Sequence, residues 1–217
     1  MIVTSSPSGV QRRSWLGIPI IQYPQDIIAL QEIIWRTRPE IIVETGIARG
    51  GSLIFFASLM ELIGGGGRVI GIDIDIRENN RRRIEAHPLF KRISLVQSSS
   101  IASNVIDEVG KITKGKKTMI VLDSDHSHQH VLAELRLYSA FVSLGCYLVV
   151  LDTIIEDLPD SMFSNRSWGR GNNPKTAVHE FLAETDNFEI DGSIPSKLLI
   201  TVAPDGYLVR VKTSSHD

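Results

Sequence analysis

Continuous apolar runs alternate with longer amphipathic stretches through most of the chain. Because the apolar runs are not broken by regularly spaced polar residues, they are typical of strands in a parallel sheet that is covered on both faces. The longer stretches carry apolar residues at helical spacing, and Asp26 is the expected N-terminal cap of the first. The pattern therefore predicts an α/β fold, with strands at 41–44, 68–73, 93–97, 118–123 and 147–151 and helices at 26–38, 52–63, 78–86, 101–111 and 128–143.

The pattern changes after the last of these strands. A long loop at 152–173 has little periodicity, and Asn173 before Pro174 predicts the start of a helix that runs to 184. Two apolar runs at 198–202 and 207–211 flank the turn dipeptide Asp205-Gly206, which predicts a terminal antiparallel hairpin. The whole is then a seven-stranded, mostly parallel sheet. We expect an irregular N-terminal arm at 1–23 and one domain at 24–217.

Composition narrows the function classes. The chain has 217 residues, a net charge of −2, 42% hydrophobic and 22% charged residues, as expected for one globular domain and not for a broad nucleic-acid surface. The single cysteine, Cys146, lies in an apolar run and is expected in the core, which fits a reducing compartment. No apolar stretch is long enough for a transmembrane helix and no signal-peptide core is present, so we expect a cytoplasmic protein.

A glycine-rich segment from Glu44 to Gly51 follows the first predicted strand, and Asp73 ends the second. This layout is typical of a nucleoside-cofactor site, where glycines admit the ligand to the backbone and Asp73, or alternatively Asp75, accepts hydrogen bonds from ribose hydroxyls. Because no complete G-x-G-x-x-G is present, we favour S-adenosylmethionine, which has no phosphate, over a dinucleotide. A tight strand-to-helix turn without a ligand is the alternative. The candidate cofactor-binding residues are Glu44, Thr45, Gly46, Gly50, Gly51, Asp73, Ser98, Ser99 and Asp123.

Acidic residues and histidines follow the fourth and fifth predicted strands, at the same edge of the sheet. Asp123, Asp125 and Asp152 are candidate Mg²⁺ ligands, and His126 is the candidate general base. Each aspartate could instead cap a helix or loop. Zinc binding by His126, His128 and His130 is the disfavoured alternative, because no Cys or Glu completes a tetrahedral set; we interpret His128 and His130 as exposed residues of a helix.

Two polar segments have less specific interpretations. The charge run at 77–83 is interpreted as a solvated helix face, with an anionic partner as the alternative. The loop at 168–175 is rich in glycine and asparagine and carries Trp168, so it is a candidate lid over the substrate, or else an ordered surface connection. Glu156 and Asp157 either extend the site or solvate the loop. Trp15 is the expected anchor of the N-terminal arm, and an exposed Trp15 would suit a second copy of the chain.

Taken together, these segments resemble the cephalosporin hydroxylase family of S-adenosylmethionine-dependent O-methyltransferases, and more distantly the macrolide-sugar and catechol-type O-methyltransferases. The resemblance spans nearly the whole chain, and the order of its motifs is more specific than any one of them. The fold implied is a Rossmann-like class I methyltransferase fold. The matching segments are WLGIPI at 15–20, PEIIVETGIARGGS at 39–52, VIGIDIDIR at 69–77, HPLFKRI at 87–93, VLDSDHSHQHVLAELRLY at 121–138 and GCYLVVLDT at 145–153.

The resemblance implies residue roles position by position. Glu44 and Gly46 match the cofactor loop, Asp73 the ribose-binding acid, Asp123 and Asp152 two metal ligands, and His126 the base of the sugar-methylating relatives. The chain departs from the family where relatives often carry two adjacent metal-binding residues, because Leu151 precedes Asp152 here and Thr153 follows it. Thr153, Asp125 or a water molecule could replace the missing ligand.

The expected function is methyl transfer from S-adenosylmethionine to a hydroxyl of a small molecule, such as a sugar or natural product, with Mg²⁺ assisting. Two alternatives stay open. The first is a non-catalytic nucleoside-binding protein of the same fold, which the departure at Leu151 favours. The second is an NAD-dependent sugar-modifying enzyme, against which the incomplete glycine motif argues. No nucleic-acid or transmembrane partner is expected, and a homo-oligomer is left open.

Overall fold

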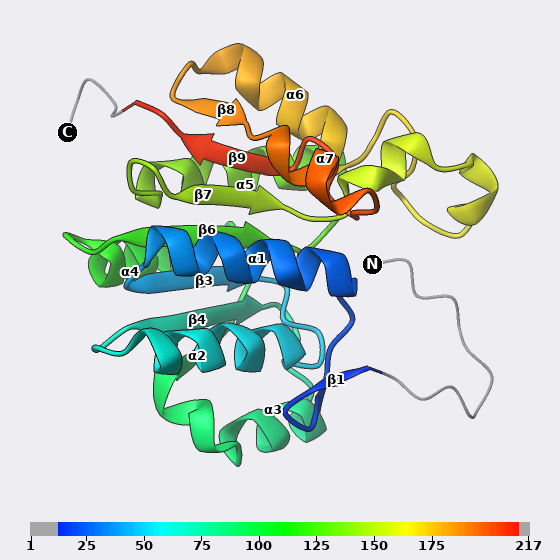
Figure 1. The fold of residues 1–217 in the computed structure, drawn as a ribbon. Helices are drawn as coiled ribbons and strands as arrows, with labels where there is room; N and C mark the ends of the chain where they lie inside the picture. Colours follow the sequence, from blue (N-terminus) through cyan, green and yellow to red (C-terminus); the bar gives the residue numbers. More distant parts are fainter. Residues whose placement is uncertain (1–12, 213–217) are drawn as a thin grey trace.

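The structure, a computed structural model, describes residues 13–212. Its centre is a seven-stranded sheet of order β5-β4-β3-β6-β7-β9-β8, in which β3 to β7 run parallel and β9 runs antiparallel to both β7 and β8 (Figure 1). The strands are β3 (Ile41–Thr45), β4 (Arg68–Asp73), β5 (Ile93–Gln97), β6 (Thr118–Leu122), β7 (Tyr147–Val150), β8 (Phe188–Ile190) and β9 (Tyr207–Arg210). The predicted sheet is therefore confirmed, including its antiparallel end.

Helices cover both faces of the sheet, as the continuous apolar strands require. One hydrophobic core joins one face to α1, α2 and α3, and a second core joins the other face to α4, α5 and α6. Figure 1 shows α1 and α2 in front of the strands and α4 and α5 behind them. The helices are α1 (Pro24–Thr37), α2 (Gly51–Ile63), α3 (Glu78–Glu85), α4 (Ser103–Thr113), α5 (His128–Tyr138), α6 (Pro174–Glu184) and α7 (Ser193–Leu198).

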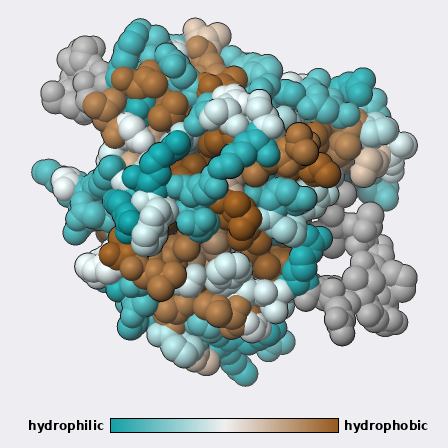
Figure 2. Space-filling model, in the orientation of Figure 1, coloured by the Kyte–Doolittle hydropathy of each residue, from teal (hydrophilic) through white to brown (hydrophobic). Residues whose placement is uncertain are grey.

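The predicted terminal hairpin is wrong in one strand. Residues 198–202 do not pair with β9; the partner is β8, and α7 lies in the connection between the two strands. The apolar residues that suggested a strand are partly on the surface, since Leu199 and Ile200 are exposed. Figure 2 shows apolar side chains gathered over α7, on a face where polar and apolar side chains are otherwise mixed. A short apolar run next to a turn was not enough to identify a strand.

Asp26 is not the cap of the first helix. α1 begins at Pro24 after Tyr23, and Asp26 is buried in its first turn. Its carboxylate accepts hydrogen bonds from the Val202 amide at 3.0 Å and the Tyr207 hydroxyl at 2.8 Å, and it also bonds the Thr201 hydroxyl. It therefore ties α1 to the segment that leads into β9. By contrast, α6 begins as predicted, with a capping box between Asn173 and Thr176.

The described part of the N-terminal arm folds back onto the domain. Two short antiparallel strands, β1 (Ser14–Trp15) and β2 (Ile18–Pro19), replace the irregular segment expected there. The Trp15 indole donates a hydrogen bond to Ser58 Oγ at 3.1 Å and packs edge-on against Phe55. Trp15 is thus an anchor within its own chain and not the exposed contact expected for a partner subunit.

Four short 3-10 helices complete the described chain: η1 (Pro88–Arg92), η2 (Ser139–Phe141), η3 (Thr153–Asp157) and η4 (Asp160–Met162). The helix predicted at 128–143 is accordingly shorter, with η2 following α5. Within residues 13–212, no helix has the length and apolar character needed to cross a membrane.

Candidate active site

The carboxyl ends of β3, β4, β6 and β7 meet at one edge of the sheet because these strands are parallel and adjacent. The loop after β3, Asp73 at the end of β4, residues 123–126 after β6 and Asp152 after β7 all lie there. A cavity of about 500 Å³ opens between the first three of these segments, and its volume is in the range of roughly 300–1,000 Å³ usual for small-molecule sites.

Asp73 organises the loop that follows β3. Its Oδ2 accepts hydrogen bonds from the backbone amides of Ile47 at 3.0 Å and Ala48 at 3.3 Å, and its Oδ1 accepts one from Asp75 at 3.0 Å. The Asn80 side chain holds the same loop through the Ala48 carbonyl. Asp73 Oδ1 accepts only one of these bonds and has a further lone pair, so it can still accept a hydrogen bond from a ligand hydroxyl. Asp75, the alternative ribose contact, lines a wider outer hollow.

The three glycines of this loop are needed for packing within the protein. A Cβ on Gly46, whose φ is +81°, would lie 2.0 Å from the Asp123 carbonyl oxygen. A Cβ on Gly50 would meet the Ile84 side chain at 2.3 Å, and one on Gly51 would meet the Pro19 carbonyl oxygen at 2.3 Å. The expectation that these glycines admit a ligand is therefore supported only for Gly46, which also lines the cavity.

Glu44 and Thr45 are buried beneath the loop. Glu44 Oε2 accepts a hydrogen bond from Ser52 Oγ at 2.9 Å, and burial raises the pKa of Glu44 to about 8, so this carboxyl is mostly protonated at neutral pH. Glu44 Oε1 and Thr45 Oγ1 have no hydrogen-bond partner among residues 13–212. Unpaired buried polar atoms are costly, so they are candidates for contacts with a bound ligand.

The cavity contains only part of the set that the sequence predicted for the cofactor. Gly46, Asp73, Ser99 and Asp123 line it. Glu44, Thr45, Gly50, Gly51 and Ser98 are not among its lining residues. The sequence reasoning missed Ile74, which directly follows Asp73 and is 75% exposed. The remaining unpredicted lining residues are Ala48, Ile72, Ser100, Ser124 and His130.

Asp123, His126 and Asp152 form an acid–histidine cluster beside the cavity, and each has a ligand atom within 4.8 Å of those of the others. His126 Nε2 lies 3.3 Å from Asp152 Oδ2. Burial, and then the neighbouring Asp152 carboxylate, raise the pKa of Asp123 well above its usual range. Burial lowers the pKa of His126 to about 4, although the Asp152 carboxylate opposes this, so the imidazole is neutral at pH 7.

This donor set suits a divalent cation. Carboxylate oxygens are the ligands that Mg²⁺ and Mn²⁺ prefer, and a cation would relieve the repulsion between the two carboxylates. Asp152 has a left-handed backbone with φ 58°, and its side chain makes no capping hydrogen bond to η3, against the capping alternative. Asp125, the third predicted metal ligand, is not part of the cluster. Its Oδ1 accepts the Ser127 amide at 2.7 Å.

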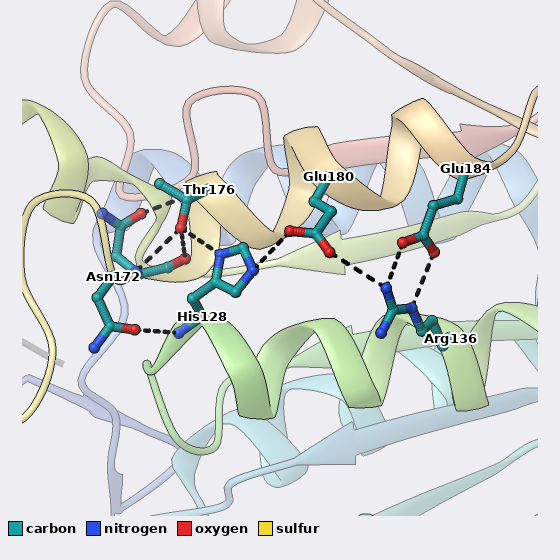
Figure 3. A network of polar contacts seen from close by, with 7 residues as sticks. His128, Arg136, Asn172, Thr176, Glu180 and Glu184 are labelled. Atoms are coloured by element: carbon teal, nitrogen blue, oxygen red, sulfur yellow. Dashed lines mark hydrogen bonds and ion pairs between the residues drawn. The ribbon is translucent and has the colours of Figure 1, made fainter.

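The other two histidines point to different partners, so the three do not assemble a zinc site. His130 Nε2 lies 3.2 Å from Ser100 Oγ and 3.5 Å from the buried carboxylate of Glu134, which raises the pKa of His130. Figure 3 shows His128 on α5 directed at α6, where it contacts Thr176 and Glu180. The interpretation of His128 and His130 as merely exposed residues was wrong, since both are half-buried.

The loop predicted as a lid lies against the acid–histidine cluster. Trp168 packs edge-on against the His126 ring, with centroids 5.0 Å apart, and Arg166 stacks over Trp168. Glu156 bonds the Gly171 amide and the Asn173 side chain, while Asp157 pairs with Lys175 at 2.8 Å. These two acids therefore anchor the loop. The charge run of α3 forms the expected helix face, with ion pairs one turn apart.

Known proteins resemble this chain over most of its length. The family model described as Rhamnosyl O-methyltransferase/CmcI matches residues 9–211. The rhamnosyl O-methyltransferase of Mycobacterium tuberculosis (strain ATCC 25618 / H37Rv) is 32% identical over 203 residues, which are 92% of this chain and 78% of that protein. The enzyme of the same name from Mycobacterium leprae (strain TN) is 30% identical over 200 residues, 91% of this chain and 82% of that protein.

Solved structures share the fold. A CmcI structure with Mg and SAM superposes with a TM-score of 0.63 at 20% identity, covering 92% of this chain and 77% of that chain. An O-methyltransferase from Bacillus cereus in complex with SAH gives a TM-score of 0.54 at 19% identity, covering 77% of this chain and 72% of that chain. The α/β architecture seen here is thus that of methyltransferases, as predicted.

Proposed function

The chain belongs to the Rhamnosyl O-methyltransferase/CmcI family, and from this premise we propose that it transfers the methyl group of S-adenosylmethionine to a hydroxyl of a sugar or a related natural product. The observation that carries the proposal is the acid–histidine cluster beside the cavity, with Asp123 and His126 belonging to both. These two residues therefore border the place for the cofactor and the place for the acceptor. A rhamnosyl acceptor is favoured by the names of the relatives.

The glycine-loop side of the cavity would hold the cofactor. Asp73 accepts hydrogen bonds from the ribose hydroxyls, and the exposed Ile74 side chain offers an apolar surface to the nucleoside base. The unpaired oxygens of Glu44 and Thr45 lie below the loop, where they suit the polar methionine part of the cofactor. These assignments use the residues that the sequence predicted and add Ile74.

The acid–histidine side would perform the chemistry. The sulfonium of S-adenosylmethionine supplies an already activated methyl group, so the main task of the protein is to align the acceptor oxygen with it. His126 is neutral at pH 7 and takes the proton from the acceptor hydroxyl. A proton on Nε2, shared with Asp152, leaves the accepting lone pair on Nδ1. Bound at Asp123 and Asp152, Mg²⁺ would supply Lewis acidity toward an acceptor oxygen.

Membership of a methyltransferase family favours this function over the NAD-dependent and the non-catalytic alternatives. We infer a reducing, cytoplasmic compartment for the enzyme, which its single free cysteine, Cys146, fits. A homo-oligomer stays a prediction.

The proposed function can be tested with purified protein. Calorimetric titration should detect binding of S-adenosylmethionine, and S-adenosylhomocysteine should accumulate when a rhamnosyl glycoside and Mg²⁺ are added. If S-adenosylmethionine did not bind, the proposed methyl transfer would be contradicted. Binding without transfer to any member of a broad panel of sugar and natural-product hydroxyls would instead support the non-catalytic alternative.

A further inference from the structure

Gln22 is a buried amide that neither the fold nor the proposed chemistry has used so far. It lies between β2 and α1, only 8% of its surface is exposed, and both Oε1 and Nε2 lack hydrogen-bond partners among residues 13–212. An unpaired buried amide costs free energy on each of its polar atoms. Such a group in a native protein needs an explanation, and an unseen ligand is one of the few available.

The surroundings of Gln22 indicate what that ligand is. The amide shares a small hollow of about 50 Å³ with Asp123, Leu151 and Asp152. This volume is enough for a single ion or water, since one water needs on the order of 10–15 Å³ measured in this way. Two of the seven residues that line the hollow bring carboxylates, and those carboxylates belong to the acid–histidine cluster. The hollow therefore brings Gln22 together with two carboxylates and with apolar residues such as Leu151.

Leu151 explains why an additional ligand is needed. It is buried at the end of β7, next to Asp152, and its side chain offers no donor atom to a cation. The nearby Thr153 hydroxyl donates to the Pro204 carbonyl, and Asp125 is bound to the Ser127 amide. Among the candidate oxygen donors considered for the missing position, Gln22 is the one that lines the hollow.

We propose that Gln22 Oε1 is a ligand of the divalent cation held by Asp123 and Asp152, and supplies the oxygen that Leu151 cannot. The inference rests on the proposed metal-assisted function. Amide carbonyl oxygens are ordinary ligands of hard divalent cations. Because the amide is neutral, two carboxylates balance the two positive charges of the ion without excess negative charge in a buried place. The ligand thus comes from the segment before α1, far in sequence from β6 and β7.

The test is a titration of the full chain with Mn²⁺ in the absence of cofactor. Binding is measured by calorimetry and by the electron paramagnetic resonance signal of free Mn²⁺. Gln22→Leu should weaken Mn²⁺ binding by about 10-fold or more, the loss usual even for groups that only support metal ligands. Gln22→Glu should tighten binding roughly 10-fold, because a third carboxylate adds a full negative charge. Gln25→Leu is the matched control: the same substitution three residues later, away from the hollow, should leave binding unchanged.

A stability readout separates this role from a merely structural one. In metal-free protein, Gln22→Leu should raise the Tm by about 2–4 °C, because it removes a buried unpaired amide. A gain in metal-free stability together with a loss of Mn²⁺ affinity supports the proposal. Unchanged Mn²⁺ affinity in Gln22→Leu, with affinity lost in Asp123→Asn, would overturn the role of Gln22 and leave the proposed function standing. A wild type that binds S-adenosylmethionine but no Mn²⁺ would overturn the role of Gln22 and also the metal assistance.

Discussion

The two sides of the candidate active site differ in how their charges are satisfied. On the glycine-loop side, backbone amides from three residues surround the Asp73 carboxylate. On the acid–histidine side, the carboxylates of Asp123 and Asp152 lie within 4.8 Å of one another beside a neutral imidazole. The charge on the first side is satisfied within the fold, whereas the second side would gain stability from the proposed cation. The comparison indicates that one side is shaped to bind and the other to react.

The largest effect is expected on the acid–histidine side. Asp152→Asn should lower kcat/KM for methyl transfer by on the order of 1,000-fold, because it removes a charged ligand of the cation. The affinity for S-adenosylmethionine should change little, since Asp152 does not line the cofactor cavity. Steady-state kinetics and calorimetry check both parts. The control is Asp107→Asn, which changes an exposed residue on α4. If Asp152→Asn lost as much cofactor affinity as activity, the distinction between the two sides would be contradicted.

His126→Asn should lower kcat by on the order of 100-fold or more, because the acceptor hydroxyl loses its base. If His126 acts as a base, Mn²⁺ affinity should be retained; if it acts as a ligand of the cation, Mn²⁺ affinity and kcat should fall together. A Mn²⁺ titration beside the kinetics separates the two roles. His179→Asn, which affects an ion pair on α6 outside the cavity, should leave both quantities near wild type.

A third substitution tests the glycine-loop side. Gly46→Ala should lower the free energy of unfolding by about 3 kcal/mol or more, since it adds a clash with the Asp123 carbonyl to the cost of a positive φ. Gly64→Ala is a matched control: Gly64 has a φ of +83°, but a Cβ there would meet nothing within 4 Å. Gly64→Ala should lower the free energy of unfolding by only about 1–2 kcal/mol. Equal losses for the two variants in urea unfolding would show that the contact at Gly46 contributes nothing.

The smallest expected effect, counted per pH unit, is a pH dependence at Glu44. Burial raises its pKa in the folded chain to about 8 from 4.5, so the folded state binds more protons than the unfolded state between these values. The contribution of Glu44 to stability is therefore complete below pH 4.5 and is lost as the pH rises through 8. Wild type should lose up to about 1.4 kcal/mol per pH unit relative to Glu44→Gln in this interval. Urea unfolding from pH 5 to 9 measures the difference; parallel curves for the two proteins would contradict it.

Most of the sheet was predictable because the parallel strands other than the edge strand β5 are buried on both faces and so appear as mainly apolar runs. β4 and β5 have the predicted bounds, and α6 begins at the predicted cap. The errors lie where tertiary contacts decide the outcome. Aspartate is a residue type that often caps helices, but Asp26 is buried instead and accepts hydrogen bonds from Val202 and Tyr207. β8 has only three residues, two of them exposed, and this leaves too little periodicity to identify.

The site divides in the same way. By itself, the sequence determined the edge of the sheet where the site lies and its family, and it named Gly46, Asp73, Asp123, His126 and Asp152. These residues follow directly after strands, so their positions depend on local order along the chain. Only the tertiary structure decided which of them meet, that Asp125 is left out, and that Gln22 and Trp168 join the acid–histidine side. The reason is physical: burial and proximity depend on segments far apart in sequence, and a local pattern carries no information about them.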